Sequence, residues 1–382
     1  MRKKLLITLV VPTLLFLSYC NLNNTSERSV KEKEQQVTTS QEIVNLTRSS
    51  YQKVVPPPKG VYHSAYPDFG NSEDQVTLKS ITDFENLVGK RIAWAYFSDN
   101  WIDGIKFPKA SVQIIQSLHV IPFIRIMPRS SFNEYRQDPI YALQRIIDGD
   151  FDDNLKRWAQ EAKGSGIPLM LEFGTEVNGD WFPWSGKYNG AGKIGGYGDP
   201  DLPDGPERFR DAYRHIIDIF RKEGVKNVTW VYHVNSFSKP AEPWNNISSY
   251  YPGDDYIDWI GVSIYGPTEP GEKWQTFTEV LNSSYREISA IGPKKPIAVL
   301  EFGVVDDPEI GNKSLWIQTA LQSIKSGKYP HIHAISYWHE NWKNDDGSIS
   351  NLRLDSSSKA LEAYRKEIAS SFFVTKVEIA HK

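Results

Sequence analysis

The sequence predicts a (β/α)8 barrel, the TIM-barrel fold, in a single catalytic-sized domain. From Gly60 onward, short apolar, β-branched or aromatic runs alternate with amphipathic stretches, a pattern typical of parallel βαβ units. Eight such runs fall within about 285 residues, which is the size expected of this barrel. No Gly-rich phosphate-binding fingerprint follows the first run, and this disfavours an open, doubly wound sheet.

Each of these short apolar runs is predicted to form one strand. They are residues 60–64, 91–97, 120–126, 168–173, 228–234, 259–265, 296–302 and 332–338. The clearest helical patterns between them are 152–163, 206–223, 275–291 and 313–326. A proline and an acid open the second of these helices and Gly224 follows it, as expected of helix ends.

The N-terminus has the composition of an export signal. A basic segment, 1–4, precedes an apolar stretch, 5–17, that is too short to span a bilayer comfortably. The following Leu-Ser-Tyr-Cys resembles a bacterial lipoprotein cleavage box, in which Cys20 is lipidated and becomes the mature N-terminus. Tyr19 departs from that pattern, because small residues usually stand there. We therefore expect a lipoprotein-type signal at 1–20 and an extracytoplasmic, lipid-anchored protein, with ordinary secretion as the alternative.

A polar segment follows, and it predicts the domain boundaries. Residues 21–59 are rich in Asn, Ser, Thr, Glu, Lys and Gln and end near three consecutive prolines, so they are expected to form a tether. The catalytic domain is expected at 60–370. Since Cys20 is the one cysteine, the sequence excludes intrachain disulfides and Cys-based metal sites.

Charge and aromatic content indicate the class of partner. The formal net charge is −3 without long basic runs, which argues against nucleic-acid binding. Aromatic residues make up 13% of the chain, and many stand beside Asn, Asp, Gly or Pro. Most are expected in the core, whereas some should line a groove in which flat rings stack on sugars. A monomer is expected.

Two glutamates follow apolar runs at predicted strand ends, where TIM barrels place reactive groups. Glu176 closes the fourth strand region and Glu301 the seventh. Buried carboxylates are costly unless paired or hydrogen-bonded. Two of them facing each other are what retaining glycoside hydrolysis requires: one protonates the leaving oxygen and the other attacks the anomeric carbon. The alternative for either residue is a structural ion pair.

These residues carry a resemblance to a family. The layout resembles the retaining (β/α)8 glycosidase clan, and within it glycoside hydrolase family 26, the β-mannanases and related β-glucanases. The resemblance covers roughly 60–345, and Glu-Val-Asn-Gly-Asp-Trp at 176–181 is its most specific part. Further matching pieces are 182–184, 209–214, 227–231, 235, 258–265 and 295–297.

The resemblance implies roles for the residues around the two glutamates. Glu176 corresponds to the acid/base and Glu301 to the nucleophile. Tyr265 corresponds to the tyrosine that orients the nucleophile, and Trp338 to the aromatic floor under the attacked sugar, although core packing remains open for Trp338.

Three further substrate-binding residues are expected from the same stretch. Asn178 lies within the family motif, and Trp181 and Trp184 are expected to stack along the groove, with loop packing as the alternative. The sequence departs from mannanases of the family, which usually carry His and Arg where this chain has Thr175 and Glu172. This departure argues against strict mannan specificity, and Glu172 would need a basic partner such as Arg125.

Histidines near predicted strand ends are candidates for metal binding or for contacts with sugars. No metal-binding spacing connects His63, His233, His339 and Glu340, so no metal or organic cofactor is expected. His233 is instead expected to hydrogen-bond sugar hydroxyls, with a structural role left open. The absence of a Gly-x-Ser-x-Gly motif disfavours an esterase.

The sequence thus predicts an endo-acting glycoside hydrolase that cleaves a β-mannan or β-glucan type polysaccharide by double displacement. Two alternatives stay open: the same barrel acting on xylan or an exopolysaccharide, and a non-catalytic carbohydrate-binding surface lipoprotein.

Anchoring through Cys20 is directly testable. Because the apolar signal ends at this residue, we expect the mature protein to partition with membranes. Replacement of Cys20 with Ala should block processing or release the protein into the soluble fraction, as measured by membrane fractionation and intact mass. Unchanged processing and membrane association in this variant would refute the lipoprotein interpretation.

Overall fold

In the computed structural model, the described residues are 51–269, 271–344 and 347–380. The predicted signal, Cys20 and the tether up to residue 50 lie outside them. Within the described ranges, no helix is long and apolar enough to cross a membrane.

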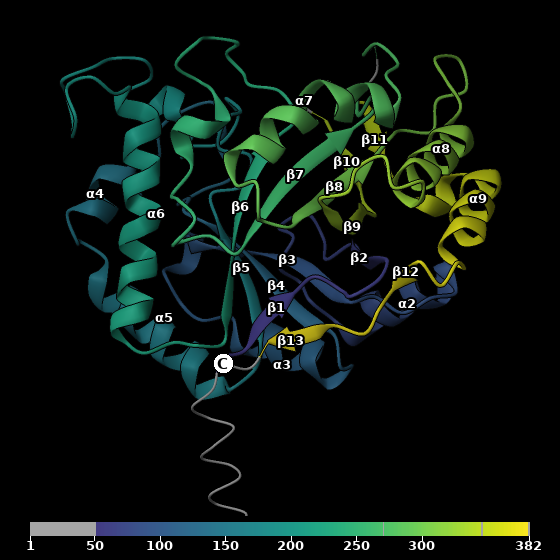
Figure 1. Cartoon of the computed structure of the whole chain (residues 1–382), viewed down its shortest axis with the longest axis horizontal. Coiled ribbons are helices and arrows are strands. Elements are labelled where there is room, and N and C mark those ends of the chain that lie inside the picture. Colours follow the sequence, from purple (N-terminus) through teal and green to yellow (C-terminus); the bar gives the residue numbers. More distant parts are fainter. Residues whose placement is uncertain (1–50, 270, 345–346, 381–382) are drawn as a thin grey trace, which may run out of the picture. The chain divides into compact units, whose positions relative to one another are not determined.

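Eight parallel strands form a closed barrel, which confirms the predicted fold (Figure 1). Each strand pairs with the next in chain order, and the pairing of β2 with β9 closes the ring. The strands lie within a few residues of the predicted runs: β2 (Val61–Tyr66), β3 (Trp94–Asn100), β4 (Ile121–Met127), β5 (Leu169–Phe173), β6 (Val228–Asn235), β7 (Trp259–Tyr265), β8 (Ile297–Gly303) and β9 (Ile332–Trp338).

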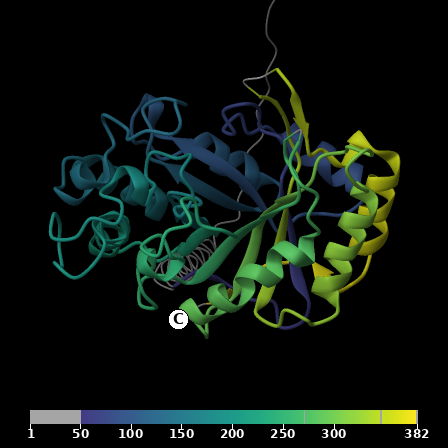
Figure 2. The same cartoon turned by 90° about the horizontal axis from the view of Figure 1, so that it is seen from above.

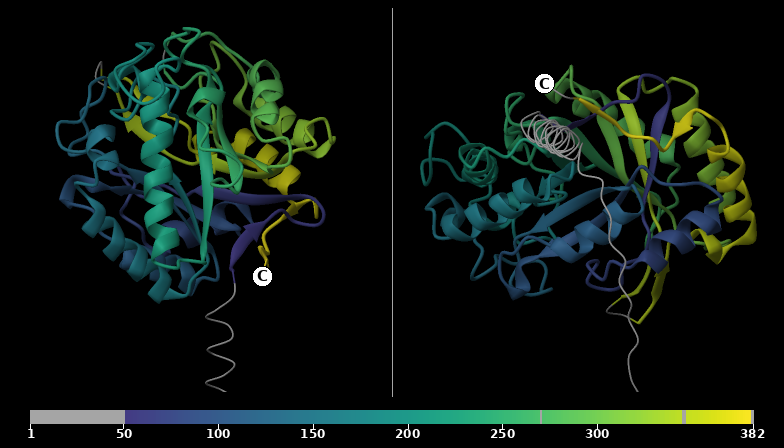
Figure 3. Two further views of the ribbon diagram at one scale, coloured as in Figure 1. Left: turned by 60° about the vertical axis from the view of Figure 1, so that its left-hand side comes forward. Right: turned by 90° about the horizontal axis from the view of Figure 1, so that it is seen from below.

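Helices surround this barrel on the outside, as Figures 2 and 3 show. They are α2 (Leu78–Val88), α3 (Lys109–Ser117), α4 (Leu143–Ile147), α5 (Asp152–Ser165), α6 (Asp204–Lys222), α7 (Phe277–Ile291), α8 (Lys313–Lys325) and α9 (Ser358–Ile368), with single 3-10 turns η1 (Trp101–Asp103), η2 (Gly186–Tyr188), η3 (Ile247–Tyr250) and η4 (Leu354–Ser356).

Local sequence explains where these helices begin and end. At α7, the Thr276 side chain accepts from the backbone of Glu279 while the Glu279 side chain accepts from that of Thr276, which forms a capping box. In α6, the acids in the first turn and the bases in the last turn both favour the helix dipole. The helix begins two residues before the predicted start, with Pro203 as its N-cap.

Short strands close the end of the barrel opposite the groove described below. β1 (Lys53–Val55) pairs antiparallel with β13 (Glu378–Ala380), and β12 (Phe373–Val374) pairs with β2. The Trp259 indole donates to the Val54 carbonyl, and the Tyr62 hydroxyl donates to that of Val55. These contacts bury Val54, so the folded unit extends beyond the predicted limits of 60 and 370 at both ends.

Two small hairpin strands, β10 (Asn341–Lys343) and β11 (Ile349–Asn351), extend the chain after β9 on the groove side. They follow Trp338 directly and bring Trp342 and Lys343 to the groove. Short strands of this kind carry too few residues for an alternation pattern, and the sequence did not predict them.

The end of β5 departs from extended geometry. Gly174 has a φ of 64° and Glu176 a φ of 50°, so the strand stops at Phe173 and strand alternation does not continue to Glu176. A Cβ atom at Gly174 would lie 2.7 Å from the Phe209 ring and 2.9 Å from that of Trp184. This position therefore requires glycine for both its backbone conformation and its packing.

Replacement of Gly174 with Ala should destabilise the protein by about 2–4 kcal/mol, because the left-handed conformation and the ring contacts each carry a cost. The matched control is Gly166→Ala: Gly166 has a φ of 63° but no atom within 4 Å of the added Cβ. That variant should lose only about 1 kcal/mol. Equal losses in urea unfolding would show that packing at Gly174 contributes nothing.

Candidate active site

A groove of about 860 Å³ lies at the C-terminal ends of the barrel strands. Five of the predicted site residues line it: Glu176, Glu301, Tyr265, Trp338 and Trp181. Its other lining residues are Asn71, Glu73, Arg125, Glu134, Tyr135, Phe182, Asn235, Ser236, Phe237, Lys239, Gly266, Pro267, Thr268, Glu269, Glu272, Lys273, Gln275, Glu340, Trp342 and Lys343.

A bulge in β8 positions Glu301. The pairing of β8 with β7 shifts so that Val262 lies opposite Val299 and Ser263 opposite Glu301, which leaves Leu300 as the extra residue. The Leu300 side chain fills space that any Cβ at Gly261 would occupy, 2.3 Å away. A bulge re-aims the side chain that follows it, and here it directs Glu301 into the groove.

Three side chains surround the Glu301 carboxylate. The Tyr265 hydroxyl donates to Oε2 at 2.8 Å, and the Tyr96 hydroxyl lies 3.4 Å from Oε1, although its one proton is donated to Glu172 in a shorter bond of 2.6 Å. Arg125 forms an ion pair with Oε1 at 3.5 Å. These contacts fix both oxygens of a residue that is only 4% exposed.

Burial dominates the electrostatics of Glu301. It raises the pKa of Glu301 to about 7, against the opposing effect of the Arg125 charge and together with repulsion from Glu176. The two glutamates therefore interact across the groove, as a pair that shares one substrate would. Below about pH 7 the Glu301 carboxyl holds a proton when the groove is empty.

Glu176 follows the irregular end of β5 and is only partly buried. The Trp181 indole donates to its Oε2 at 2.9 Å, so the loop after β5 turns back to hold this carboxylate. A Cβ atom at Gly179 would lie 2.4 Å from the Trp181 ring, and only glycine permits this close approach. Trp181 thus both lines the groove and orients Glu176.

A buried polar cluster lies beneath the two glutamates. Glu172 is completely buried, accepts from the Tyr96 hydroxyl at 2.6 Å and lies 3.6 Å from Arg125, the basic partner that the sequence suggested. His233 Nδ1 lies 3.0 Å from Glu172 and 2.7 Å from the hydroxyl of Thr175. Burial opposes the charged imidazole, but the adjacent Glu172 carboxylate raises the pKa of His233 overall.

This cluster places His233 below the groove, where it does not line the wall. Its Nε2 contacts the hydroxyl of Ser263 at 2.9 Å, so both ring nitrogens are engaged by the protein. His233 therefore supports the structure around Thr175 and Glu172, which is the structural alternative left open by the sequence, and it offers no free nitrogen to a sugar.

Two other residues that were predicted to bind substrate, Asn178 and Trp184, also lie away from the groove. Asn178 is fully buried, and its amide donates to the Asn235 and Phe237 carbonyls while its oxygen accepts from the Asn235 backbone. Trp184 is 1% exposed, donates to the Thr175 carbonyl and stacks on Phe182. Asn178 ties the loop after β5 to the loop after β6, and Trp184 packs under the first of these loops.

Trp338 reaches the groove but is largely covered. Tyr66 stacks on its ring at 4.1 Å, and the Arg125 guanidinium lies 5.0 Å from its centroid. Its indole donates to Glu340 Oε2 at 2.8 Å. With 4% of its surface exposed, Trp338 presents a small, rigid part of the groove wall.

Sequence reasoning missed several residues of the site. The aromatic Tyr135 and Phe237 line the groove from loops that carry no motif, and Tyr96, which is fully buried near Glu301, sits inside a predicted strand. Tyr135 and Phe237 are 61% and 59% exposed, which is unusual for large apolar rings. Glu73 has no sequence signal either, although its Oε2 accepts a hydrogen bond from Arg125 at 2.7 Å. Only three-dimensional proximity identifies these residues.

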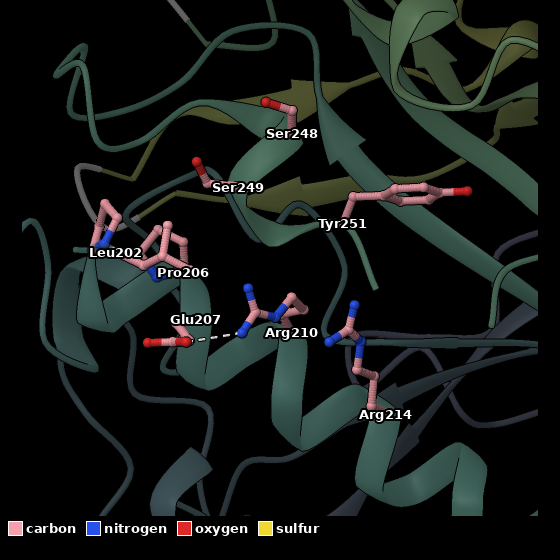
Figure 4. Close-up of a pocket in the computed structure, with 9 residues that line it drawn as sticks. Leu202, Pro206, Glu207, Arg210, Arg214, Ser248, Ser249 and Tyr251 are labelled. Atoms are coloured by element: carbon pink, nitrogen blue, oxygen red, sulfur yellow. Dashed lines mark hydrogen bonds and ion pairs between the residues drawn. The ribbon is translucent and has the colours of Figure 1, made fainter. Parts of the chain in front are cut away.

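A second, smaller cavity of about 290 Å³ lies between the start of α6 and η3 (Figure 4). Arg210 and Arg214 lie along one wall and Ser248 and Ser249 along the other. Arg210 is already paired with Glu207 at 2.9 Å. Among the described residues that line this cavity, Glu207 is the one carboxylate, so the cavity has no carboxylate pair. Among the described residues, no three His, Cys, Asp or Glu side chains gather as a metal site.

The raised pKa of Glu301 predicts a pH-dependent stability. An ordinary glutamate titrates near 4.5, so between about pH 4.5 and 7 the folded protein holds a proton that the unfolded chain releases, and stability falls as the pH rises. Glu301→Gln removes this loss. Its unfolding free energy relative to wild type should increase by up to about 3 kcal/mol from pH 5 to pH 8.

Urea unfolding at a series of pH values measures this difference, and Glu362→Gln, at an exposed position on α9, is the control. A constant difference between Glu301→Gln and wild type from pH 5 to pH 8 would contradict the raised pKa.

Comparison with known proteins identifies related sequences. The model of glycosyl hydrolase family 26 matches residues 140–345. Endoglucanase H of Acetivibrio thermocellus is 31% identical over 301 residues, which are 77% of this chain and 29% of that protein. A mannan endo-1,4-beta-mannosidase of Bacillus subtilis is 24% identical over 204 residues, which are 52% of this chain and 44% of that protein. The chain therefore matches less than half the length of either relative.

Solved structures show the same fold. An endo-beta-1,4-mannanase of Cellulomonas fimi superposes with a TM-score of 0.56 at 19% identity, over 82% of this chain and 72% of that one. The Bacillus subtilis mannanase BCman gives 0.52 at 18% identity, over 83% and 86%. Together with the family model over more than half of the sequence and the related endoglucanase, this shows that the chain belongs to glycosyl hydrolase family 26.

Proposed function

We propose that this protein hydrolyses internal β-glycosidic bonds of a polysaccharide with retention of configuration. The observation that carries the proposal is the pair Glu176 and Glu301 on one groove, with Tyr265 bonded to Glu301. Exposed aromatic rings at Tyr135 and Phe237 further along the groove suit stacking on additional sugars.

In this mechanism Glu301 is the nucleophile. Tyr265 bonds one of its oxygens and Arg125 pairs with the other, and together they orient the carboxylate toward the anomeric carbon. Glu176, held by Trp181, donates a proton to the leaving oxygen and later takes one from water, which releases the sugar from Glu301. The ionised form of Glu301 attacks, so activity should fall as the pH decreases below about 7.

The substrate class is a β-glucan or β-mannan, with glucan favoured. The relative with the higher identity is named an endoglucanase, whereas the mannosidases match at lower identity. Thr175 and Glu172 stand where mannanases usually have His and Arg, and here both belong to the buried cluster with His233. Xylan and exopolysaccharides are the alternative substrates, and a carbohydrate-binding protein without turnover is the alternative function.

An endo-acting pattern and an extracytoplasmic location complete the proposal. The groove extends beyond the glutamate pair, with residues from Asn71 after β2 to Lys273 after β7, and this length suits a chain bound across the cleavage point. The basic and apolar N-terminus ending at Cys20 supports lipid anchoring, with secretion as the alternative.

A substrate panel tests the function. The purified protein should release oligosaccharides from soluble mixed-linkage β-glucan or β-mannan, and the size of the early products should show internal cleavage. Release from xylan alone would change the substrate class. Binding without product release from any glycan would favour the non-catalytic alternative.

The two glutamates should respond differently to azide. Glu301→Ala lacks the nucleophile, so azide can attack the vacated face and give a product of inverted configuration. Glu176→Ala should form glycosyl-enzyme from substrates with good leaving groups, and azide should then give a product of retained configuration. NMR of the glycosyl azides distinguishes these outcomes. Exchanged stereochemistry would reverse the roles, and near-normal activity of both variants would place the chemistry elsewhere.

A further inference from the structure

Glu340 is a groove residue that the proposed reaction does not use. It follows β9, lines the groove and is 6% exposed. Its Oε2 accepts from the Trp338 indole at 2.8 Å. Within the part of the chain that the structure describes, its Oε1 has no hydrogen-bond partner. A carboxyl group held this firmly by one oxygen presents the other in a fixed position.

Glu73 also lines the groove, close enough for its charge to act on Glu340, and within the described part of the chain it too has one carboxyl oxygen bonded and the other free. Its Oε2 accepts from Arg125 at 2.7 Å and from the Ser98 hydroxyl at 2.5 Å, while among described residues no partner contacts its Oε1. Its backbone has a φ of 57°, a conformation that costs energy for a residue other than glycine. Glu73 and Glu340 thus form one acidic wall beside Trp338, and each has an oxygen left for a ligand.

The position of this wall indicates which part of a glycan it meets. Glu340 follows β9 and Glu176 follows β5, and these strands are four steps apart in either direction around the eight-stranded ring. The acid/base protonates the leaving group, so the departing chain lies on the Glu176 side. The chain that stays attached to Glu301 therefore extends toward Glu340.

We propose that Glu340 is a sugar-binding residue that determines specificity on the nucleophile side of the cleaved bond. Its free oxygen forms a hydrogen bond with a sugar oxygen, while Trp338 holds the other carboxyl oxygen. This inference rests on the proposed hydrolysis of a β-linked glycan and names one residue that selects the glycan.

The electrostatics of Glu340 suit such a contact. Burial raises the pKa of Glu340 to about 9, with the Glu73 charge acting in the same direction and the Trp338 hydrogen bond opposing it. The carboxyl is therefore neutral at pH 7 and can donate its proton, so it binds a neutral sugar without the full cost of burying a charge.

Among the described residues, Arg125 is the arginine that lines the groove, and it is engaged by Glu73, Glu172 and Glu301. Its guanidinium is thus not available to pair with a uronic acid.

Calorimetric binding measurements test the proposal. An inactive Glu176→Gln background prevents turnover, and gluco- and manno-oligosaccharides of three to six sugars serve as probes. Adding Glu340→Ala should weaken binding about 10- to 100-fold, the effect of losing one hydrogen bond with a buried group. Glu340→Gln, which keeps a donor and the acceptor for Trp338, should bind within about threefold. Glu362→Gln, exposed on α9, is the control for a distant carboxyl.

Monodeoxy oligosaccharides distinguish direct contact from an effect through Trp338. If Glu340 bonds one hydroxyl, the loss from Glu340→Ala should disappear for the probe lacking that hydroxyl. Additive losses with every monodeoxy probe would mean that Glu340 only positions Trp338 and would overturn the proposal, as would binding by Glu340→Ala within twofold of the background.

Two further controls keep these outcomes separate. Glu340→Leu approximately preserves the side-chain volume. It replaces Glu340→Ala if a thermal melt shows that the alanine variant is not folded. Wild-type protein that cleaves no β-glycan would refute the proposed hydrolysis, whereas the binding results on the Glu176→Gln background report on Glu340 separately.

Discussion

The guanidinium of Arg125 is the cation around which the active site is organised. Glu73 contacts it at 2.7 Å, Glu301 at 3.5 Å and Glu172 at 3.6 Å, and the residue is 3% exposed. Several carboxylates in one buried region would repel one another and take up protons without such a partner. The charge of Arg125 favours the ionised form of Glu301 and also stabilises Glu172, which is completely buried beneath the groove.

Two irregularities in the backbone turn this charged centre into a site. The left-handed residues at the end of β5 carry Glu176 out of the strand, and the bulge at Leu300 directs Glu301 toward it. Each irregularity depends on a glycine, at Gly174 and Gly261, whose missing side chain leaves room for a neighbouring one. Both irregularities lie where the backbone carries the two glutamates to the groove.

Features of the structure that depend on local sequence patterns could be predicted from the sequence. Apolar runs predicted all eight barrel strands, their ends pointed to Glu176 and Glu301, and the family resemblance added Tyr265; these three residues line one groove. Contacts made across the fold could not be predicted in the same way. Asn178 and Trp184 lie in the same stretch of sequence as Trp181, yet a turn of the loop buries these two side chains, whereas Trp181 lines the groove.

The short strands outside the predicted domain limits could not be predicted for a related reason. β1 and β13 are three residues long, and their pairing joins the two ends of the described chain, so no local pattern reveals it. The side chains of Tyr62 and Trp259 stabilise this pairing by bonding to the β1 backbone. Likewise, Tyr96 reads as an ordinary strand residue until the barrel brings it to within hydrogen-bond distance of Glu172 and Glu301.

The central claim is that Glu301 forms a covalent bond with the sugar. An activated 2-deoxy-2-fluoro glycoside slows the second step more than the first, so the intermediate should accumulate. Intact mass should then increase by one glycosyl unit, and peptide mapping should place it on Glu301. A modified residue other than Glu301, or turnover of this reagent with no adduct and an inverted product, would contradict the account.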